Sequence, residues 1–253
     1  MSSLRSKSES PECPADYGRP QGENNSFIAL DVETANSNIS SVCQIALVWF
    51  VVGKPVEVWH SLVNPGEPFA ALNVSLHGID AVAVQNSPTF ADVMRTVAAM
   101  LAGKVVASHM PFDRIALERA CSQHCIPQLT CFWIDTARVA RLAWPRFAKR
   151  GYGLRSLALW HGIDFRHHDA VEDASTAGRI LAHAVAETGI SLERWLSYST
   201  SSKSRSRKRV DKDLARGTRN SRLSSRYAAA AADRSLQLGR VFESEASTCE
   251  TLS

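Results

Sequence analysis

The sequence lacks any apolar run long enough to cross a membrane. Its longest apolar runs, such as Ile45–Val52, are much shorter than the roughly 20 residues that a membrane-spanning helix needs. Residues 1–22 are rich in serine, proline and charge and have no apolar core, which excludes a secretory signal peptide. We therefore expect a cytoplasmic protein without a membrane partner.

Paired cysteines and glycine-rich loops are also missing. None of the six cysteines forms a C-x-x-C pair, which argues against zinc ribbons and thioredoxin-like motifs. Cys121, His124 and Cys125 lie within about one helical turn, but only Cys131 is near enough to add a ligand, so reduced cysteines that pack as small apolar residues are favoured over a structural zinc. The absence of a Walker or Rossmann glycine motif argues against an ATPase or a dehydrogenase.

Positive charge is scarce outside one segment. The net charge is +4, but residues 201–226 carry ten Lys and Arg against two Asp, so the rest of the chain is net negative. This segment has little apolar content and is expected to be disordered. Attraction to nucleic-acid phosphates and a merely solvated tail are both open interpretations. Residues 227–238 form at most a marginal helix.

Between the ends, the hydrophobic pattern predicts a mixed α/β domain over residues 26–190. Residues 1–25 form an expected disordered N-terminal segment, and residues 191–253 a basic, mostly disordered tail. The expected strands are residues 27–32, 43–52, 56–63, 105–108 and 132–134, and the expected helices are 90–101, 112–124, 136–142, 154–160 and 170–187. Three strands followed by alternating helices and strands predict a mixed five-stranded sheet flanked by helices.

Two acidic residues end the first predicted strand. Asp31 and Glu33 are two residues apart, so strand geometry points both side chains to the same face. Two like charges on one face repel unless a cation lies between them, and a metal ion is the usual cation. The alternative is that Asp31 ends the strand and Glu33 is solvated in the loop.

Further acids lie at two other predicted junctions. Asp113 follows the fourth strand, where a helix dipole alone would also favour it. Asp169 and Glu172 suit a helix N-terminus, which places His168 just before the helix and Asp173 in its first turn. A histidine beside carboxylates is a natural general base, and two divalent ions can activate water and stabilise the leaving oxygen of a phosphodiester.

The order of these residues is more specific than any one of them. The motifs are Asp31-Val32-Glu33-Thr34, Pro111-Phe112-Asp113 and His168-Asp169-Ala170-Val171-Glu172-Asp173-Ala174. This series resembles the DEDD superfamily of 3′–5′ exonucleases, in particular its histidine subclass. With Val74–Ile79 and Ser87–Phe90, residues 26–188 resemble the DnaQ-like proofreading (epsilon) subunits of bacterial replicative DNA polymerase.

The resemblance implies a ribonuclease H-like fold and two Mg²⁺ or Mn²⁺ ions held by Asp31, Glu33, Asp113 and Asp173. His168 would be the general base, because it has the family's five-residue spacing from the last aspartate, although His167 lies beside it. The tyrosine subclass is disfavoured because its tyrosine position is occupied by Asp169.

Two substrate-binding residues follow from the same resemblance. Thr34 would lie at the nucleotide-binding edge, the alternative being a loop hydroxyl. The family often has His-Asn where this chain has Ser108 and His109. His109 would therefore either approach the terminal nucleotide or pack near the strand end.

The function expected from these residues is 3′–5′ exonucleolytic hydrolysis that releases nucleoside 5′-monophosphates, in DNA replication or repair. The partner would be a nucleic acid with a free 3′ end, with single-stranded DNA favoured and RNA as the main competitor, because no feature reads the 2′-hydroxyl. A polymerase subunit is a further candidate partner. A catalytically silent, polymerase-associated binding module is the alternative, but such a relative would be expected to have lost at least one of the five residues.

Overall fold

The computed structural model describes residues 26–200 and 203–220. In chain order its elements are β1 (Ser26–Thr34), β2 (Val42–Val51), β3 (Lys54–Leu62), α1 (Ala71–His77), α2 (Ala81–Val84), α3 (Phe90–Leu101), β4 (Val105–Ser108), α4 (Phe112–Gln123), β5 (Phe132–Asp135), α5 (Thr136–Ala143), the 3-10 helix η1 (Pro145–Phe147), α6 (Leu154–His161), α7 (Ala170–Thr188), α8 (Leu192–Ser199) and α9 (Lys203–Asn220). No helix within these residues is both long and apolar enough to cross a membrane.

The strands form one mixed sheet in the order β3-β2-β1-β4-β5. β1 pairs antiparallel with β2 and parallel with β4, and β5 continues the parallel part. Because β1 and β4 run in the same direction, the end of β4 and the start of α4 lie beside the C-terminal half of β1. The predicted five-stranded sheet flanked by helices is confirmed.

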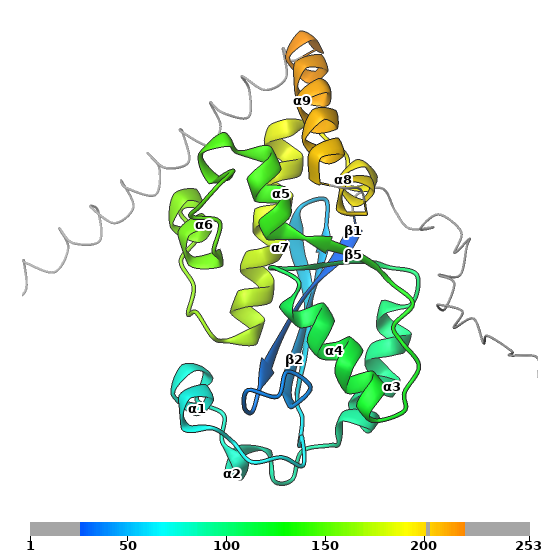
Figure 1. Cartoon of the computed structure of the whole chain (residues 1–253), viewed down its shortest axis with the longest axis vertical. Coiled ribbons are helices and arrows are strands. Elements are labelled where there is room, and N and C mark those ends of the chain that lie inside the picture. Colours follow the sequence, from blue (N-terminus) through cyan, green and yellow to red (C-terminus); the bar gives the residue numbers. More distant parts are fainter. Residues whose placement is uncertain (1–25, 201–202, 221–253) are drawn as a thin grey trace, which may run out of the picture.

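Side chains alternate between two cores, as the period of two in a strand requires. Phe27 and Ala29 of β1 pack in the core that α5, α6, α7 and α8 cover. Ile28 and Leu30 pack in the core that α3 and α4 cover. These two groups of helices lie on opposite faces of the sheet (Figure 1).

α7 lies close against the sheet at Gly178. A Cβ at this position would come within 2.2 Å of the ring of Phe50, which is fully buried and stacks on Phe27 with ring centroids 4.9 Å apart. Glycine is therefore required here by the close approach, although it lowers helix propensity by roughly 1 kcal/mol relative to alanine.

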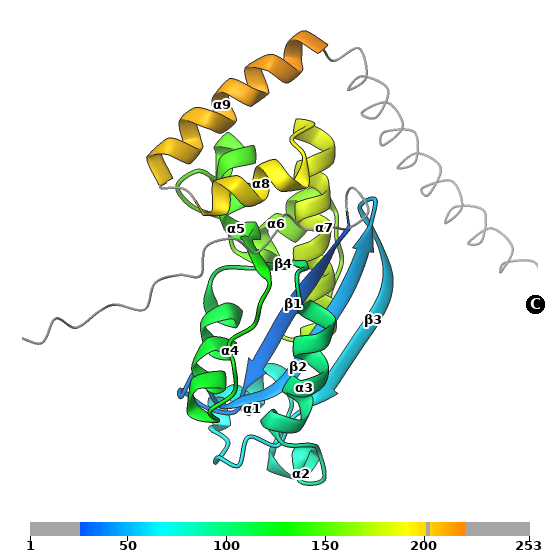
Figure 2. The ribbon, with the colours of Figure 1, turned by 90° about the vertical axis from the view of Figure 1, so that its right-hand side faces the viewer.

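The carboxyl-terminal part of the described chain forms two helices within residues 191–253, for which the sequence predicted a mostly disordered segment. α8 buries Trp195 and Tyr198 completely, and α9 buries Val210. Both views show α9 beside α8, at the end of the molecule opposite α1 and α2 (Figures 1 and 2). Residues 1–25 and 221–253, with the predicted marginal helix, lie outside the described residues, and their expected disorder stays a prediction.

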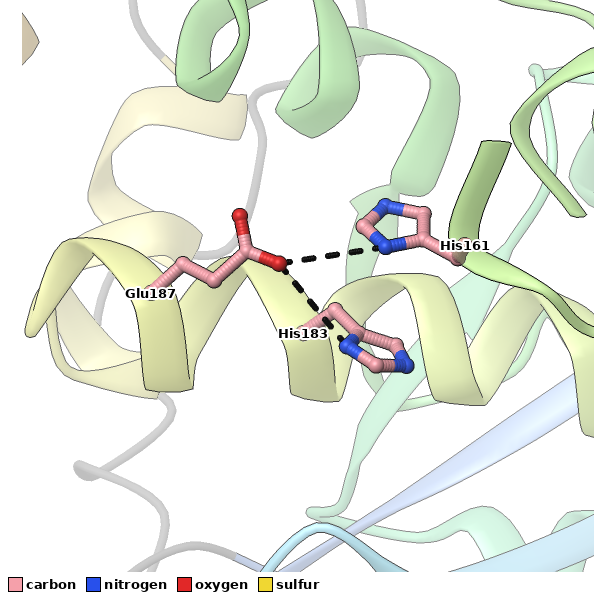
Figure 3. Close-up of side chains that lie close together, drawn as sticks. All are labelled: His161, His183 and Glu187. Carbon is pink, nitrogen blue, oxygen red and sulfur yellow. Dashed lines mark ion pairs between the residues drawn. The ribbon is translucent and has the colours of Figure 1, made fainter. Parts of the chain in front are cut away.

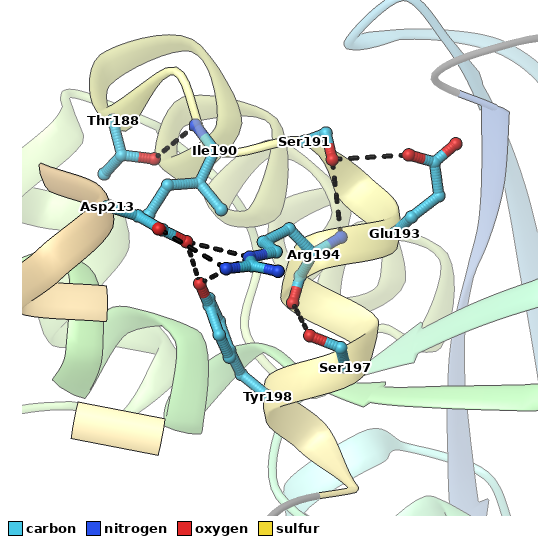
Figure 4. Close-up of polar contacts among 8 residues, drawn as sticks. All are labelled: Thr188, Ile190, Ser191, Glu193, Arg194, Ser197, Tyr198 and Asp213. Carbon is cyan, nitrogen blue, oxygen red and sulfur yellow. Dashed lines mark hydrogen bonds and ion pairs between the residues drawn. The ribbon is translucent and has the colours of Figure 1, made fainter. Parts of the chain in front are cut away.

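Polar contacts hold α9 on its neighbours. Asp213 of α9 accepts hydrogen bonds from the Nε of Arg194, 2.8 Å away, and from the hydroxyl of Tyr198 (Figure 4). Arg207 of α9 donates to the backbone oxygen of Arg141 in α5, at 3.1 Å. The prediction of disorder rested on the few apolar residues of the basic segment. The segment docks through one buried apolar residue, Val210, together with polar contacts to other helices.

Candidate active site

β1 directs Asp31 and Glu33 toward α7. Both side chains share the face of Phe27 and Ala29, which pack under this helix. They lie beyond the last apolar residue of that face, so they are half-buried at the end of the strand. Alternation along β1 therefore places the two carboxylates together, as predicted from their spacing.

α4 supplies the third carboxylate. Asp113 lies in the first turn of this helix and is only 2% exposed. Its Oδ1 accepts a hydrogen bond from the backbone N–H of Val32 at 3.1 Å. This bond joins the start of α4 to β1 and fixes Asp113 beside the end of that strand.

α7 supplies the fourth carboxylate. Asp169 caps this helix by accepting hydrogen bonds from the N–H groups of Val171 and Glu172, and Asp173 follows in the first turn, 4% exposed. Carboxylate oxygens of Asp31, Glu33 and Asp173 lie within 4.8 Å of one another. Elements distant in sequence thus bring the predicted acids to one place.

Burial and mutual repulsion raise the pKa values of these acids. The pKa of Asp31 is well above its usual range, because the group is buried and faces Asp113 and Asp173. The same two causes raise the pKa of Glu33 to about 8. Burial raises the pKa of Asp113 to about 7, against the opposing effect of its bond from Val32.

Such a group of carboxylates fits divalent cations. Several negative charges taken out of water repel unless a cation compensates them, and this repulsion contributes to the raised pKa values. Carboxylate oxygens are the hard ligands that Mg²⁺ and Mn²⁺ prefer. Asp31, Glu33, Asp113 and Asp173 are therefore the residues that could hold such ions.

The two histidines before α7 contact Asp173 in different ways. The Nδ1 of His167 lies 3.0 Å from Asp173 Oδ1, whereas His168 donates its backbone N–H to Oδ2, also at 3.0 Å. His168 has a φ of 67°, a left-handed conformation, and its ring stacks on that of His167 with centroids 4.1 Å apart. The ring that contacts the aspartate is thus that of His167, and the ring of His168 is left for another role.

The two predicted substrate residues both line the cleft, but they differ in their contacts. Thr34 is buried, and its backbone oxygen accepts a hydrogen bond from the side chain of Asn73 at 2.8 Å. The two ring nitrogens of His109 lie 2.9 Å from the hydroxyl of Thr136 and 3.0 Å from the backbone oxygen of Tyr152. Because burial lowers its pKa to about 4, His109 is neutral, and these contacts favour its packing role.

The carboxylates open into a cleft of about 550 Å³. Three apolar residues that line it, Leu76, Met110 and Phe112, are 43–48% exposed. The sequence did not predict that these residues line the cleft, because an isolated apolar residue near a helix end does not indicate which surface it will face. The same holds for Asn73, which joins α1 to the end of β1 through Thr34.

Comparison with known proteins identifies the family. The RNase T family model, which describes exonucleases, matches residues 28–181. The chain therefore belongs to the RNase T exonuclease family and is a hydrolase of the exonuclease class. The predicted membership of an exonuclease family is confirmed.

One relative is similar to part of the chain. DNA polymerase III PolC-type of Streptococcus pyogenes serotype M2 (strain MGAS10270) is 27% identical over 158 residues, which are 61% of this chain. The match spans only 11% of that much longer protein.

Two solved structures share the fold. Exonuclease X in complex with 5′ overhanging duplex DNA is 21% identical with a TM-score of 0.55, and the match covers 68% of this chain and 98% of that one. The nuclease domain of 3′hExo, a DEDDh family member bound to rAMP, is 17% identical with a TM-score of 0.52, covering 63% and 90%. The fold is the expected ribonuclease H-like one.

Proposed function

We propose that this protein is a metal-dependent 3′–5′ exonuclease that removes nucleoside 5′-monophosphates from single-stranded DNA. The observation that carries the proposal is the gathering of Asp31, Glu33, Asp113 and Asp173 around one cleft. Held by these carboxylates, two Mg²⁺ or Mn²⁺ ions would supply activation of the attacking water and stabilisation of the leaving oxygen.

His168 is the proposed general base. Desolvation and the neighbouring His167 lower its pKa, so the ring is neutral near pH 7 and a ring nitrogen can accept a proton. The left-handed backbone conformation of His168 and the hydrogen bond from its N–H to Asp173 fix the position of its Cα, from which the ring extends. His167 instead orients Asp173 through its own ring.

The cleft suits the end of a strand rather than a long duplex. Its volume of about 550 Å³ is in the range of small-ligand sites and can take one or two nucleotides. The exposed side chains of Leu76, Met110 and Phe112 offer apolar surface against which a base can pack. Thr34 lies at the edge of the same cleft, where we propose that it contacts the terminal nucleotide.

DNA is the proposed substrate, and RNA is the main alternative. One structural neighbour was solved with duplex DNA and another with rAMP, so the shared fold accommodates both chemistries. The relationship to a replicative polymerase favours DNA and makes a polymerase subunit a candidate partner.

The test compares DNA and RNA oligonucleotides of one sequence, labelled at the 5′ end, with Mg²⁺, Mn²⁺ or EDTA. We expect a ladder that shortens from the 3′ end, requires metal and is faster on DNA. Asp31→Asn should abolish it, whereas His60→Gln, an exposed substitution on β3, should not. Faster laddering of RNA would replace DNA as the substrate. Metal-dependent binding without cleavage by the folded protein would favour the silent module.

A further inference from the structure

Two histidines and a glutamate meet on the outer side of α7. His183 and Glu187 are four residues apart on this helix, so they share one face, and His161 ends α6 beside them (Figure 3). The Nδ1 atoms of His161 and His183 each lie 3.8 Å from the same oxygen, Oε1 of Glu187. One ligand atom from each residue lies within 4.8 Å of the other two.

His161 is a buried imidazole that makes no hydrogen bond to any described residue. Its side chain is 5% exposed, and its Nδ1 is too far from Glu187 for a hydrogen bond. Its Nε2 is also buried, and no hydrogen-bond partner lies among the described residues. A buried polar ring left unpaired in this way costs free energy. A ligand at Nδ1 would give the ring one polar partner, on the side that faces Glu187, while Nε2 would stay unpaired among the described residues.

Glu187 is already oriented toward both rings. Trp144 donates its Nε1–H to Oε2 of Glu187 at 2.7 Å, which turns the other oxygen, Oε1, toward the histidines. Hydrogen bonds of this kind to the second oxygen of a ligating carboxylate are typical of metal centres. The rings of Trp144 and Trp160 pack on His161, with centroids 4.6 and 4.5 Å away, and restrict its orientation.

We propose that His161, His183 and Glu187 form a binding site for Zn²⁺ that is separate from the exonuclease centre. Nδ1 of each histidine and Oε1 of Glu187 would be the protein ligands, with a fourth position open to water. Tetrahedral Zn²⁺ with bonds of about 2.0–2.1 Å places its ligands about 3.4 Å apart. The two 3.8 Å separations would contract by about 0.4 Å. The two imidazole rings, which stack with centroids 4.4 Å apart and planes at 24°, would also have to turn so that both Nδ1 lone pairs point at the ion.

The two imidazoles among the three ligands favour Zn²⁺ over the Mg²⁺ proposed for the catalytic site. Imidazole nitrogens suit zinc and neighbouring transition metals, whereas Mg²⁺ prefers oxygen ligands. Burial holds the pKa of His161 at about 4 and lowers that of His183, so both rings are neutral with a free lone pair near pH 7.

The site's position gives it a structural role. His183 lies ten residues after Asp173 on α7, which is about 15 Å along the helix axis. An ion held there joins the end of α6 to the C-terminal part of α7 without contacting the catalytic carboxylates. The proposal therefore stands independently of the proposed nuclease activity.

The experiment titrates the folded protein with Zn²⁺ and measures binding by calorimetry and the thermal midpoint Tm. An Asp173→Asn background removes the residue common to the two other groups of potential ligands among the described residues. Titration of the unsubstituted protein in saturating Mg²⁺ serves as a second background. We expect one Zn²⁺ per chain and a rise in Tm of about 5–10 °C at free Zn²⁺ near 100 times Kd.

Two substitutions test the assignment. His183→Gln and Glu187→Gln, both at partly exposed side chains, should each weaken Zn²⁺ binding by at least tenfold. In the Glu187→Gln variant the amide oxygen can still accept from Trp144, so this change removes the charge while keeping the packing. The matched controls His60→Gln and Glu57→Gln, on exposed positions of β3, should bind as before. Absence of Zn²⁺ binding, or binding that survives both site substitutions, would overturn the proposal.

Discussion

Two adjacent histidines contact Asp173, and the atoms that they use separate their roles. The His167 ring lies 3.0 and 3.2 Å from the two carboxylate oxygens, whereas His168 contributes only its backbone N–H. The ring of His168 is therefore available to exchange a proton within the cleft, which it lines. Substituting each histidine should have different kinetic effects.

We expect His168→Gln to lower kcat by about 10²–10⁴-fold, the usual contribution of a general base. His167→Gln should lower kcat by less than tenfold at saturating Mg²⁺. It should mainly raise the Mg²⁺ concentration needed, because Asp173 loses the group that orients it. Steady-state rates over a Mg²⁺ titration measure both effects. The opposite ranking of kcat would assign the base to His167.

The raised carboxylate pKa values predict how stability depends on pH. Glu33 titrates at about 8 in the folded protein rather than 4.5, so between these values the folded state binds more protons than the unfolded state. In the metal-free protein, the contribution of Glu33 to the free energy of unfolding is therefore fully present below pH 4.5 and is lost as the pH rises toward 8. We expect Tm in EDTA to decrease from pH 5 to pH 8.

Mg²⁺ should stabilise the protein more at pH 8 than at pH 5, because it competes with protons for the same carboxylates. Glu33→Gln should flatten the pH dependence of Tm in EDTA, since the substituted residue cannot ionise. Thermal unfolding in EDTA and in Mg²⁺ at both pH values checks this. A Tm that increases from pH 5 to pH 8 in EDTA would contradict the assignment of repulsion at the site.

Local sequence patterns located the candidate carboxylates but not their surroundings. Strand alternation and helix capping are properties of neighbouring residues, so Asp31, Glu33 and Asp173 could be placed in advance. The contact of His167 with Asp173 depends on the left-handed backbone at His168. This conformation is usually indicated by a glycine, and the sequence has a histidine there. The meeting of His161 with His183 depends on how α6 packs on α7.

At the level of elements, α7 connects the features on which function depends. It carries Asp173 in its first turn, Gly178 against the sheet and His183 farther along. The position of the first turn therefore depends on the packing of Gly178 against Phe50. A change at that contact should affect both stability and the catalytic site.

We expect Gly178→Ala to destabilise the protein by about 1–3 kcal/mol, a typical cost of overpacking a core. The new Cβ would come within 2.2 Å of the ring of Phe50, which is too close to be offset by the higher helix propensity of alanine. Urea unfolding measures the change.

The double variant with Phe50→Leu provides the control. In that background the added methyl has space, so Gly178→Ala should cost less than it does alone. An equal cost in both backgrounds would show that the Phe50 contact is not the cause.

The docking of α8 and α9 on the core could not be predicted from the sequence. Composition indicated that a segment so rich in lysine, arginine and serine cannot form its own core. The segment instead completes a core formed by other helices, with Val210 buried and Asp213 paired with Arg194. Composition within a segment does not report the apolar surface that the remainder of the fold offers it.

At the scale of the whole molecule, the positively charged helix α9 and the active site lie at opposite ends of α7. Asp173 is at the start of α7, whereas α9 follows α8 beyond the other end of that 19-residue helix (Figure 1). At 1.5 Å per residue α7 is about 28 Å long. The exposed lysines of α9 can therefore contact only a substrate long enough to extend past α7.

We expect the pair of substitutions Lys208→Gln and Lys212→Gln to weaken binding of long single-stranded DNA. If each lysine neutralises one phosphate, the slope of log K against log salt should become less steep by about 1.4. Cleavage of a nucleotide ester too short to reach α9 should be unchanged.

The pair Lys54→Gln and Lys104→Gln, exposed positions outside α9, is the matched control. Equal effects of the two pairs on the salt slope would show that net charge, and not α9, determines affinity. Weaker cleavage of the short ester by the α9 pair would indicate damage to the catalytic site instead.

Single-turnover cleavage of 5′-labelled single-stranded DNA tests most directly whether the four carboxylates form a metal-dependent nuclease centre. We expect stepwise shortening from the 3′ end in Mg²⁺, none in EDTA, and a loss of at least about 10³-fold in a folded Asp31→Asn protein. Undiminished cleavage by Asp31→Asn, or cleavage that persists in EDTA, would contradict this expectation.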